Sequence, residues 1–179
     1  MAYLFAQFNN HLKVKTIMNK VYGLINDFVP IRSERIRNVV SYAFTPVGDG
    51  VHALWNEIYL YKNQDPDMAY KSIRNYILND IDTETKRRIT EEMRWNNHMV
   101  WLSIENQQNY KTALDIAVET DGSNLPVRLR LGTTDEPHYE VFETIESLKE
   151  FWVSCSNHIS ECLRAGWALK DSVQWEHFK

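Results

Sequence analysis

The stretch from Trp95 to Lys111, WNNHMVWLSIENQQNYK, constrains the fold more than any other part of the chain. Asn96-Asn97 separates two short apolar runs, and asparagine is, after glycine, the residue that best tolerates the left-handed geometry of a two-residue hairpin turn. Ser103 stands where a helix cap is needed, because its hydroxyl can accept a hydrogen bond from a free N–H of the first turn. The stretch therefore predicts a tight hairpin followed directly by a capped helix.

A second hairpin and a second helix are expected after Gly122, where the first helix should end. VRLRL and HYEVF alternate apolar and polar residues on either side of the loop GTTDEP, which indicates two antiparallel strands. Thr144 can cap the last helix, whose apolar stripe is Ile145, Leu148, Trp152, Cys155, Ile159 and Cys162. The order hairpin, helix, hairpin, helix predicts an α+β fold, with a small antiparallel sheet of about four strands and both helices on one face.

The first 64 residues predict a helical N-terminal arm, which is a candidate docking region. Pro30 would end its first helix, and Ser33 would cap a second one. The segment TPVGDGV breaks the chain, and residues 51–61 fit a short helix or a strand. Apolar residues at spacings of three and four predict that the first segment is a helix or short coiled coil, with one stripe made of Val14, Ile17, Val21, Leu24 and Phe28. The second helix would carry Ile36, Val39, Val40 and Phe44 on one face.

Residues 65–179 are predicted to form one α+β domain that begins with helices. Asp65-Pro66 would start the first of these, and Asp82 would cap the next. Residues 1–64 carry seven basic and four acidic residues, a net charge of +3, whereas residues 65–179 carry a net charge of −7. This asymmetry fits a basic arm that docks on an acidic partner, and it also fits a solvated helix face.

The composition fits a folded chain, since 44% of its 179 residues are hydrophobic and 12% are aromatic. No apolar run approaches the ~18 residues that span a bilayer. The first charges follow the apolar N-terminal residues, whereas in a secretory signal they precede them. Cys155 and Cys162 would lie about 10 Å apart along one helix, too far for a disulfide, so we expect two buried apolar residues.

No motif in the chain predicts a reaction. The sequence lacks CxxC and HExxH, and GDG at 48–50 lacks the frame of a phosphate-binding loop. Two candidate groups fall inside a predicted helix: a nucleophile cluster of Ser154, Cys155 and His158, and a metal-ligand pair of His158 and Cys162. Packing is the simpler interpretation of both, and a position in the middle of a helix offers no oxyanion hole. The pI of about 5.9 disfavours nucleic acid as a partner. We therefore expect no catalytic residue, no cofactor, no metal and no membrane partner.

Several short strings follow one another in order between about Asp80 and Trp175. They are DIDTET, Trp95, VWLS with ENQ and NYK, LPV, GTTDEPHY, Phe142, and GW with KDS from Gly166. In these strings the chain resembles a domain of unknown function in tailed bacteriophages of gut bacteria, often encoded among tail-fibre and other virion genes. One departure is Asn96-Asn97 where that family has Asn-Gly. Residues 1–64 match no part of it, and the family brings no catalytic residues to carry over.

The resemblance implies a virion component, made in the host cytoplasm, that acts by assembly with other virion proteins. We expect a non-enzymatic structural or adaptor protein of the tail or the head–tail connector region, present as a homo-oligomer or in several copies. Two alternatives stay open: a small phage protein that binds a host factor in the cytoplasm, and an unrecognised hydrolase. The candidate interface residues are Val14, Ile17, Val21, Leu24, Phe28, Arg32, Arg35, Trp167 and Trp175.

Overall fold

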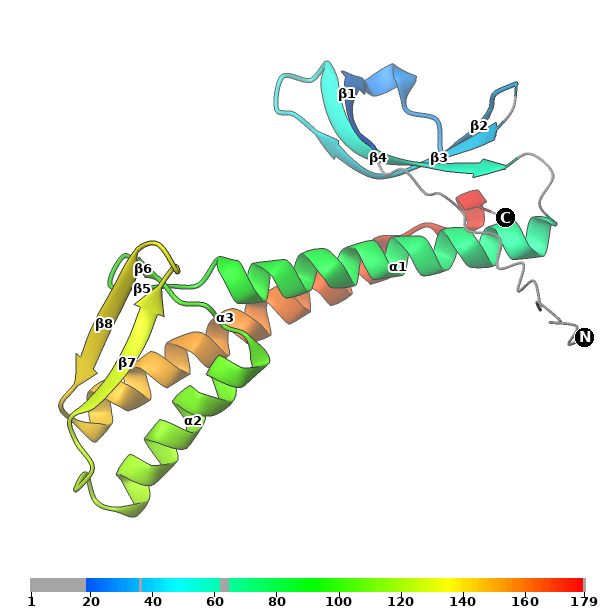
Figure 1. Ribbon diagram of the computed structural model, residues 1–179. Coiled ribbons are helices and arrows are strands. Elements are labelled where there is room, and N and C mark those ends of the chain that lie inside the picture. Colours follow the sequence, from blue (N-terminus) through cyan, green and yellow to red (C-terminus); the bar gives the residue numbers. More distant parts are fainter. Residues whose placement is uncertain (1–18, 36, 62–64, 179) are drawn as a thin grey trace, which may run out of the picture. The chain divides into compact units, whose positions relative to one another are not determined.

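The computed structural model describes residues 19–35, 37–61 and 65–178, which fall into two compact units (Figure 1). Unit 1 holds the described residues up to Ile77 together with residues 173–178. Unit 2 runs from Leu78 to Ser172. The long helix α1 (Pro66–Glu91) contributes to both units, and the short 3-10 helix η2 (Trp175–Phe178) belongs to unit 1.

Unit 1 is built on a four-stranded antiparallel sheet. Its strands are β1 (Asn19–Leu24), β2 (Ile31–Ser33), β3 (Arg37–Pro46) and β4 (His52–Tyr61), with the order β1-β4-β3-β2. A 3-10 turn, η1 (Ile25–Asp27), follows β1. The sheet therefore places β4 in the centre, beside β1 on one side and β3 on the other (Figure 1).

The predicted helical arm is wrong, because the described part of the first 64 residues is made of strands. Val21 and Leu24 lie on β1, and Ser33 ends β2 opposite Asn38 instead of capping a helix. The apolar spacing had two interpretations, since the run KVYGL also alternates between two faces. Pairing with β4, which no local window contains, decides between them. Val14, Ile17 and Ile36 lie outside the described residues.

The centre of the sheet in unit 1 is covered on both faces. Four consecutive residues of β3, from Val39 to Tyr42, are buried, which is the pattern of a strand with packing on both sides. Gly23 lies under the ring of Trp55, and a Cβ there would overlap that ring. The other buried apolar residues of the unit are Ala53, Ile58, Leu60, Ile73, Ile77 and Phe178.

Unit 2 contains two hairpins and two further helices. The first hairpin is β5 (Arg94–Trp95) and β6 (His98–Met99), followed by α2 (Ile104–Glu119). The second is β7 (Val127–Gly132) and β8 (Pro137–Phe142), followed by α3 (Ile145–Ser172). The hairpins form two separate two-stranded sheets, so the predicted single sheet of about four strands is wrong. The first hairpin has only two residues in each strand, and it meets the second through side chains.

The hairpin turn and the helix caps at Ser103 and Thr144 that were predicted for this unit are confirmed. Asn96 and Asn97 have φ of 46° and 67°, the left-handed geometry of the predicted turn. The Ser103 hydroxyl accepts a hydrogen bond from the Asn106 N–H at 3.2 Å, and Thr144 accepts one from Ser147 at 3.1 Å. The predicted cap at Asp82 is wrong, because α1 continues through it.

The core of unit 2 gathers around Phe151 of α3, which is fully buried. Trp95 and Tyr110 meet its ring edge-on, at centroid distances of 5.3 and 5.2 Å. Cys155 and Cys162 are free and buried, as predicted.

Candidate functional site

Glu57 is the most deeply buried carboxylate that the structure describes, with 4% of its surface exposed. The Arg32 guanidinium binds both of its oxygens, with distances of 2.6 Å from Nη1 to Oε1 and 3.1 Å from Nη2 to Oε2. Trp55 Nε1 donates to Oε1 at 3.2 Å, and the Tyr59 hydroxyl donates to Oε2 at 3.2 Å. Trp55, Glu57 and Tyr59 lie on the same face of β4 because side chains alternate along a strand.

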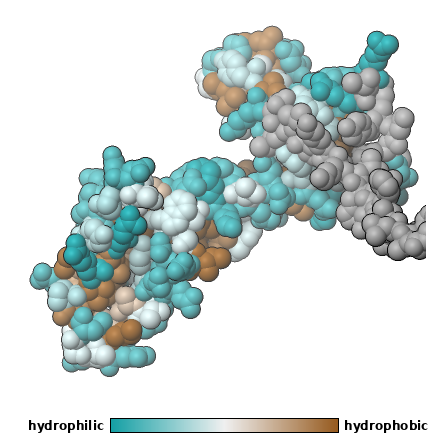
Figure 2. All heavy atoms as spheres, viewed as in Figure 1, coloured by the Kyte–Doolittle hydropathy of each residue, from teal (hydrophilic) through white to brown (hydrophobic). Residues whose placement is uncertain are grey.

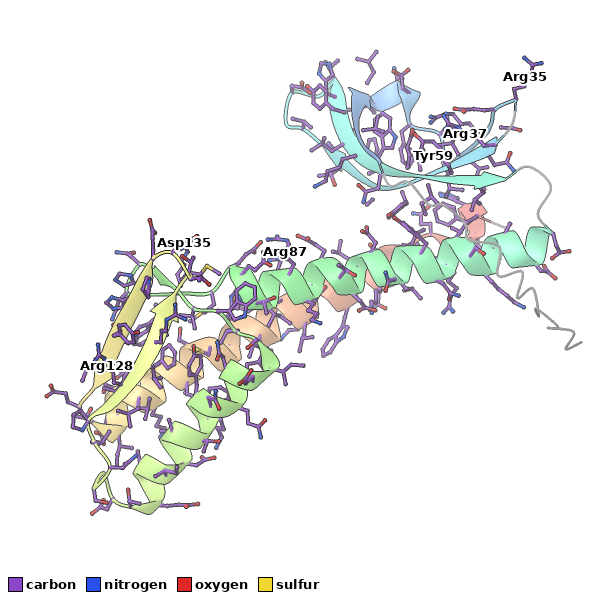
Figure 3. All side chains as sticks on the ribbon, viewed as in Figure 1. Arg35, Arg37, Tyr59, Arg87, Arg128 and Asp135 are labelled. Carbon is purple, nitrogen blue, oxygen red and sulfur yellow. The ribbon has the colours of Figure 1, made fainter. Side chains whose placement is uncertain are left out.

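These contacts belong to a closed ring of five side chains, the Glu57 ring. Arg32 also approaches Glu34, with 3.5 Å from Nε to Oε1, and Arg37 Nε donates to the other Glu34 oxygen at 2.6 Å. The Arg37 guanidinium lies 3.9 Å from the centroid of the Tyr59 ring, and Tyr59 completes the ring at Glu57. Figure 3 shows Arg37 and Tyr59 side by side on neighbouring strands, whereas Arg35 points away from the sheet.

The Glu57 carboxylate is suited to holding strands together and is a poor proton donor. Burial pushes its pKa up, but the bonds from Arg32, Trp55 and Tyr59 outweigh burial, so that the pKa lies below its ordinary value. A carboxylate with four donors has each oxygen engaged. It is therefore ionised at neutral pH and has no free lone pair directed at a substrate.

A second carboxylate, Glu140 of β8, joins the two hairpins of unit 2. Its Oε1 accepts bonds from Asn96 Nδ2 at 2.8 Å and Trp95 Nε1 at 3.3 Å, and its Oε2 lies 2.9 Å from His138 Nε2. Burial raises the pKa of Glu140, but the contacts with His138, Asn96 and Trp95 outweigh burial and lower it overall. The rings of His98 and His138 are stacked, with centroids 3.5 Å apart and an interplanar angle of 3°.

This arrangement does not form a chelate. Two stacked parallel imidazoles present their nitrogens side by side, whereas metal ligands must converge on one point. Within the described ranges, no group of three or more His, Cys, Asp or Glu side chains could hold a metal ion. No helix in the same part of the chain is long and apolar enough to cross a membrane.

The candidate interface residues are spread over both units. Leu24 is 46% exposed on β1, and Trp167 is 57% exposed on α3. Val21 is half-buried, and Phe28 packs against Phe44 and Trp55 at 4.8 and 5.9 Å. Arg32 belongs to the Glu57 ring, and Arg35 is exposed beside it. Trp175 is half-buried, with the Arg74 guanidinium 5.7 Å from its ring centroid, and Val14 and Ile17 lie outside the described residues.

An apolar surface lies at the β1 side of the sheet in unit 1. Tyr22 is 59% exposed and Leu54 is 37% exposed, and the two are directly paired between β1 and β4. Leu24 follows on the same face, and His52 stacks on the Tyr22 ring at 5.0 Å. We call Tyr22, Leu24 and Leu54 the β1 patch. Figure 2 shows hydrophobic residues at the surface of this unit.

Comparison with known proteins adds no relative: no family model, curated protein or solved structure gives a significant match.

The Glu57 ring was missed by the sequence reasoning. The sequence feature that could have indicated this site is the single acid in LWNEIYLY. If this segment is a strand, its side chains alternate between two faces, and Trp55, Glu57 and Tyr59 share one of them. Because residues 51–61 fitted either a short helix or a strand, the sequence alone did not place these three side chains on one face.

Proposed function

We propose that this chain is a non-enzymatic structural or adaptor protein of a tailed-phage particle, in the tail or the head–tail connector region, present in several copies. The β1 patch carries the proposal. Clustered exposed apolar residues on a sheet face favour contact with another protein, because that surface is removed from water on association. The resemblance of the ordered strings to a phage domain favours a virion as the setting.

The decisive experiment is mass spectrometry of purified particles. Stoichiometric presence of the chain supports the proposal, and absence from particles while the protein is abundant in the infected cell contradicts it.

A variant of the β1 patch tests the surface itself. Leu24→Glu places a charge on an exposed position and should leave unit 1 folded, because Leu24 is not part of its buried core. We expect the variant to be lost from particles. The matched control is Ile104→Glu, which changes a residue that is 78% exposed on α2. Equal incorporation of Leu24→Glu and the control would contradict the role of the patch.

The structure also determines which truncation is informative. Removing residues 1–30 would delete β1 and leave the β4 edge unpaired, so a loss of incorporation would only report misfolding. Removing residues 1–18 leaves every described strand in place. We expect the shortened chain to fold and to join the particle as the wild type does, because it keeps the whole β1 patch.

A host-factor-binding protein is the second candidate, because the β1 patch would serve that function equally well. Capture of one host protein by the wild type, and not by Leu24→Glu, together with absence from particles, would favour this candidate.

A further inference from the structure

Strand β1 forms one edge of the sheet in unit 1, and no described residue pairs with its outer side (Figure 1). Its six residues pair with β4 without a register shift, so this edge is regular along its whole length. The opposite edge, β2, has only three residues. A very short edge strand protects a sheet from pairing with another chain, whereas a long, regular edge presents unpaired N–H and C=O groups. The sheet therefore has one protected edge and one open edge.

The backbone groups that face outward from β1 belong to Lys20, Tyr22 and Leu24. The Ile25 N–H donates to the Val51 carbonyl at 2.9 Å, in the pair that follows Leu24 along the ladder. In an antiparallel ladder, pairs that exchange hydrogen bonds alternate with pairs that do not. Every second residue back from Ile25 therefore bonds to β4, and the residues between them direct their N–H and C=O groups away from it.

The side chains along this edge do not protect it either. Tyr22 and Leu24 are 59% and 46% exposed, and Lys20 is the only charged residue of the strand. The strand contains no proline. Edge strands in natural proteins are usually blunted by proline, by charged side chains or by a bulge. β1 thus combines free hydrogen-bonding groups with exposed apolar side chains, as does a sheet edge that accepts another strand.

We infer that β1 pairs antiparallel with β1 of a second copy of the chain, across a two-fold axis at Tyr22. In this register Tyr22 lies opposite its equivalent, and Lys20 lies opposite Leu24 of the other copy. The outward groups of both strands are then all used, in about six hydrogen bonds between the copies. An axis at Lys20 would instead place two lysines opposite each other, which is unfavourable, and would leave Leu24 without a partner in the strand.

The pairing would join the two four-stranded sheets into one continuous sheet. Tyr22 and Leu54 are directly opposite in β1 and β4, so their side chains share one face, and Leu24 shares it too. The β1 patches of the two copies would therefore lie side by side on the same face of the joined sheet. The inference rests on the proposed assembly function for its biological meaning, and it identifies a second copy as one partner within that assembly.

A charge at the axis position tests the pairing in the full-length chain. Tyr22→Lys and Tyr22→Glu each place a charge opposite an identical charge, whereas a mixture of the two variants brings opposite charges together. We expect the wild type to be a dimer by light scattering, and either variant alone to dissociate about tenfold more readily. An equimolar mixture should restore a one-to-one dimer of the two variants. Such a rescue requires that residue 22 meets its own equivalent.

Two controls separate the effect of charge from other effects. Tyr22→Thr keeps a neutral side chain that suits a strand, so it should dissociate less readily than either charged variant. Leu24→Glu would lie opposite Lys20 of the second copy, where the charges attract, so it should remain a dimer even though the proposed function expects its loss from particles. Equal dissociation of Leu24→Glu and Tyr22→Glu would contradict the register.

Cysteine substitutions report the register directly. Tyr22→Cys should link two copies on oxidation, because directly opposite residues lie within reach of a disulfide. Leu24→Cys should not, because Leu24 and its equivalent would lie about 13 Å apart along the strands. The native Cys155 and Cys162 are buried and do not compete. Equal linking by the two variants would contradict an axis at Tyr22.

A monomeric wild type at high protein concentration, or a failed rescue by mixing, would overturn the inference. A chain that dimerises only after removal of residues 1–18 would also overturn it, because those residues would then be the occupant of the edge. Particle composition is a separate measurement. A chain found in virions but monomeric in solution would refute this pairing only, and a dimer that is absent from particles would refute the proposed function only.

Discussion

Ser41 and Glu57 lie directly opposite each other in β3 and β4, and both are buried, but their side chains are satisfied very differently. The Glu57 carboxylate has four donors, whereas the Ser41 hydroxyl has no hydrogen-bond partner among the described residues. The donors from Arg32, Trp55 and Tyr59 occupy both Glu57 oxygens, so the carboxylate offers the hydroxyl no free position.

Replacing Ser41 with alanine should stabilise the protein. A buried hydroxyl without a partner destabilises the fold by about 1 to 3 kcal/mol, and the alanine removes that penalty at the loss of one small contact. We expect the free energy of unfolding, measured by urea denaturation, to rise by about 1 kcal/mol. Ser33→Ala, at an exposed position of β2, should change it little. A clear decrease for Ser41→Ala would show that the hydroxyl has a bonding partner.

Arg32→Met should destabilise unit 1 through the carboxylate that it leaves behind. Removing one partner of a buried ion pair typically destabilises by 3 to 5 kcal/mol, and because the Arg32 side chain is 36% exposed we expect about 2 kcal/mol. Arg35→Met, an exposed neighbour, should have an effect near zero. Equal effects of the two substitutions would contradict this role of the ion pair.

The pH dependence of stability should carry the signature of Glu57. Its pKa is lower in the folded protein than in the unfolded chain, so its contribution to stability is present above the unfolded pKa of roughly 4.3 and is lost as the pH falls through the folded pKa. Glu57→Gln has no such titration. We therefore expect urea midpoints of the wild type to decline more steeply than those of Glu57→Gln between about pH 5 and pH 3. Parallel curves would contradict the assignment.

The two asparagines of the first hairpin should respond to glycine in opposite directions. Both have positive φ, which glycine adopts without strain, so Asn97→Gly should stabilise by about 0.5 to 1 kcal/mol. Asn96→Gly relieves similar strain but removes the bond to Glu140 at 2.8 Å, and a bond to a charged group is worth about 1.5 to 3 kcal/mol. Thermal unfolding should therefore place Asn97→Gly above the wild type and Asn96→Gly below it. The same sign for both would contradict the role of Asn96.

Gly166→Ala should destabilise unit 2, although alanine is the better helix former by about 1 kcal/mol. A Cβ at Gly166 of α3 would overlap the side chain of Thr85 on α1. We expect a net loss of about 1 to 2 kcal/mol, and the double variant with Thr85→Ala should recover part of it. Additive effects in this double-mutant cycle would show that the two residues do not meet.

The success of the sequence reasoning depended on how local each determinant is. The Asn96-Asn97 turn and the caps at Ser103 and Thr144 are set by a few neighbouring residues, and all three are present. The β1 strand was taken for a helix because its partner, β4, lies about 30 residues further along the chain. The Glu57 ring joins β2, β3 and β4, so it could be found only after those pairings were known.

The closed form of the Glu57 ring limits how this sequence can change over time. Strand β2 has three residues, and Arg32 at its centre reaches past β3 to a carboxylate on β4. A change at one position of the ring leaves a charge or a hydroxyl without its counterpart, whereas replacing Arg32 and Glu57 together by apolar residues does not. In natural variants of this protein, these two positions should therefore be kept together or lost together.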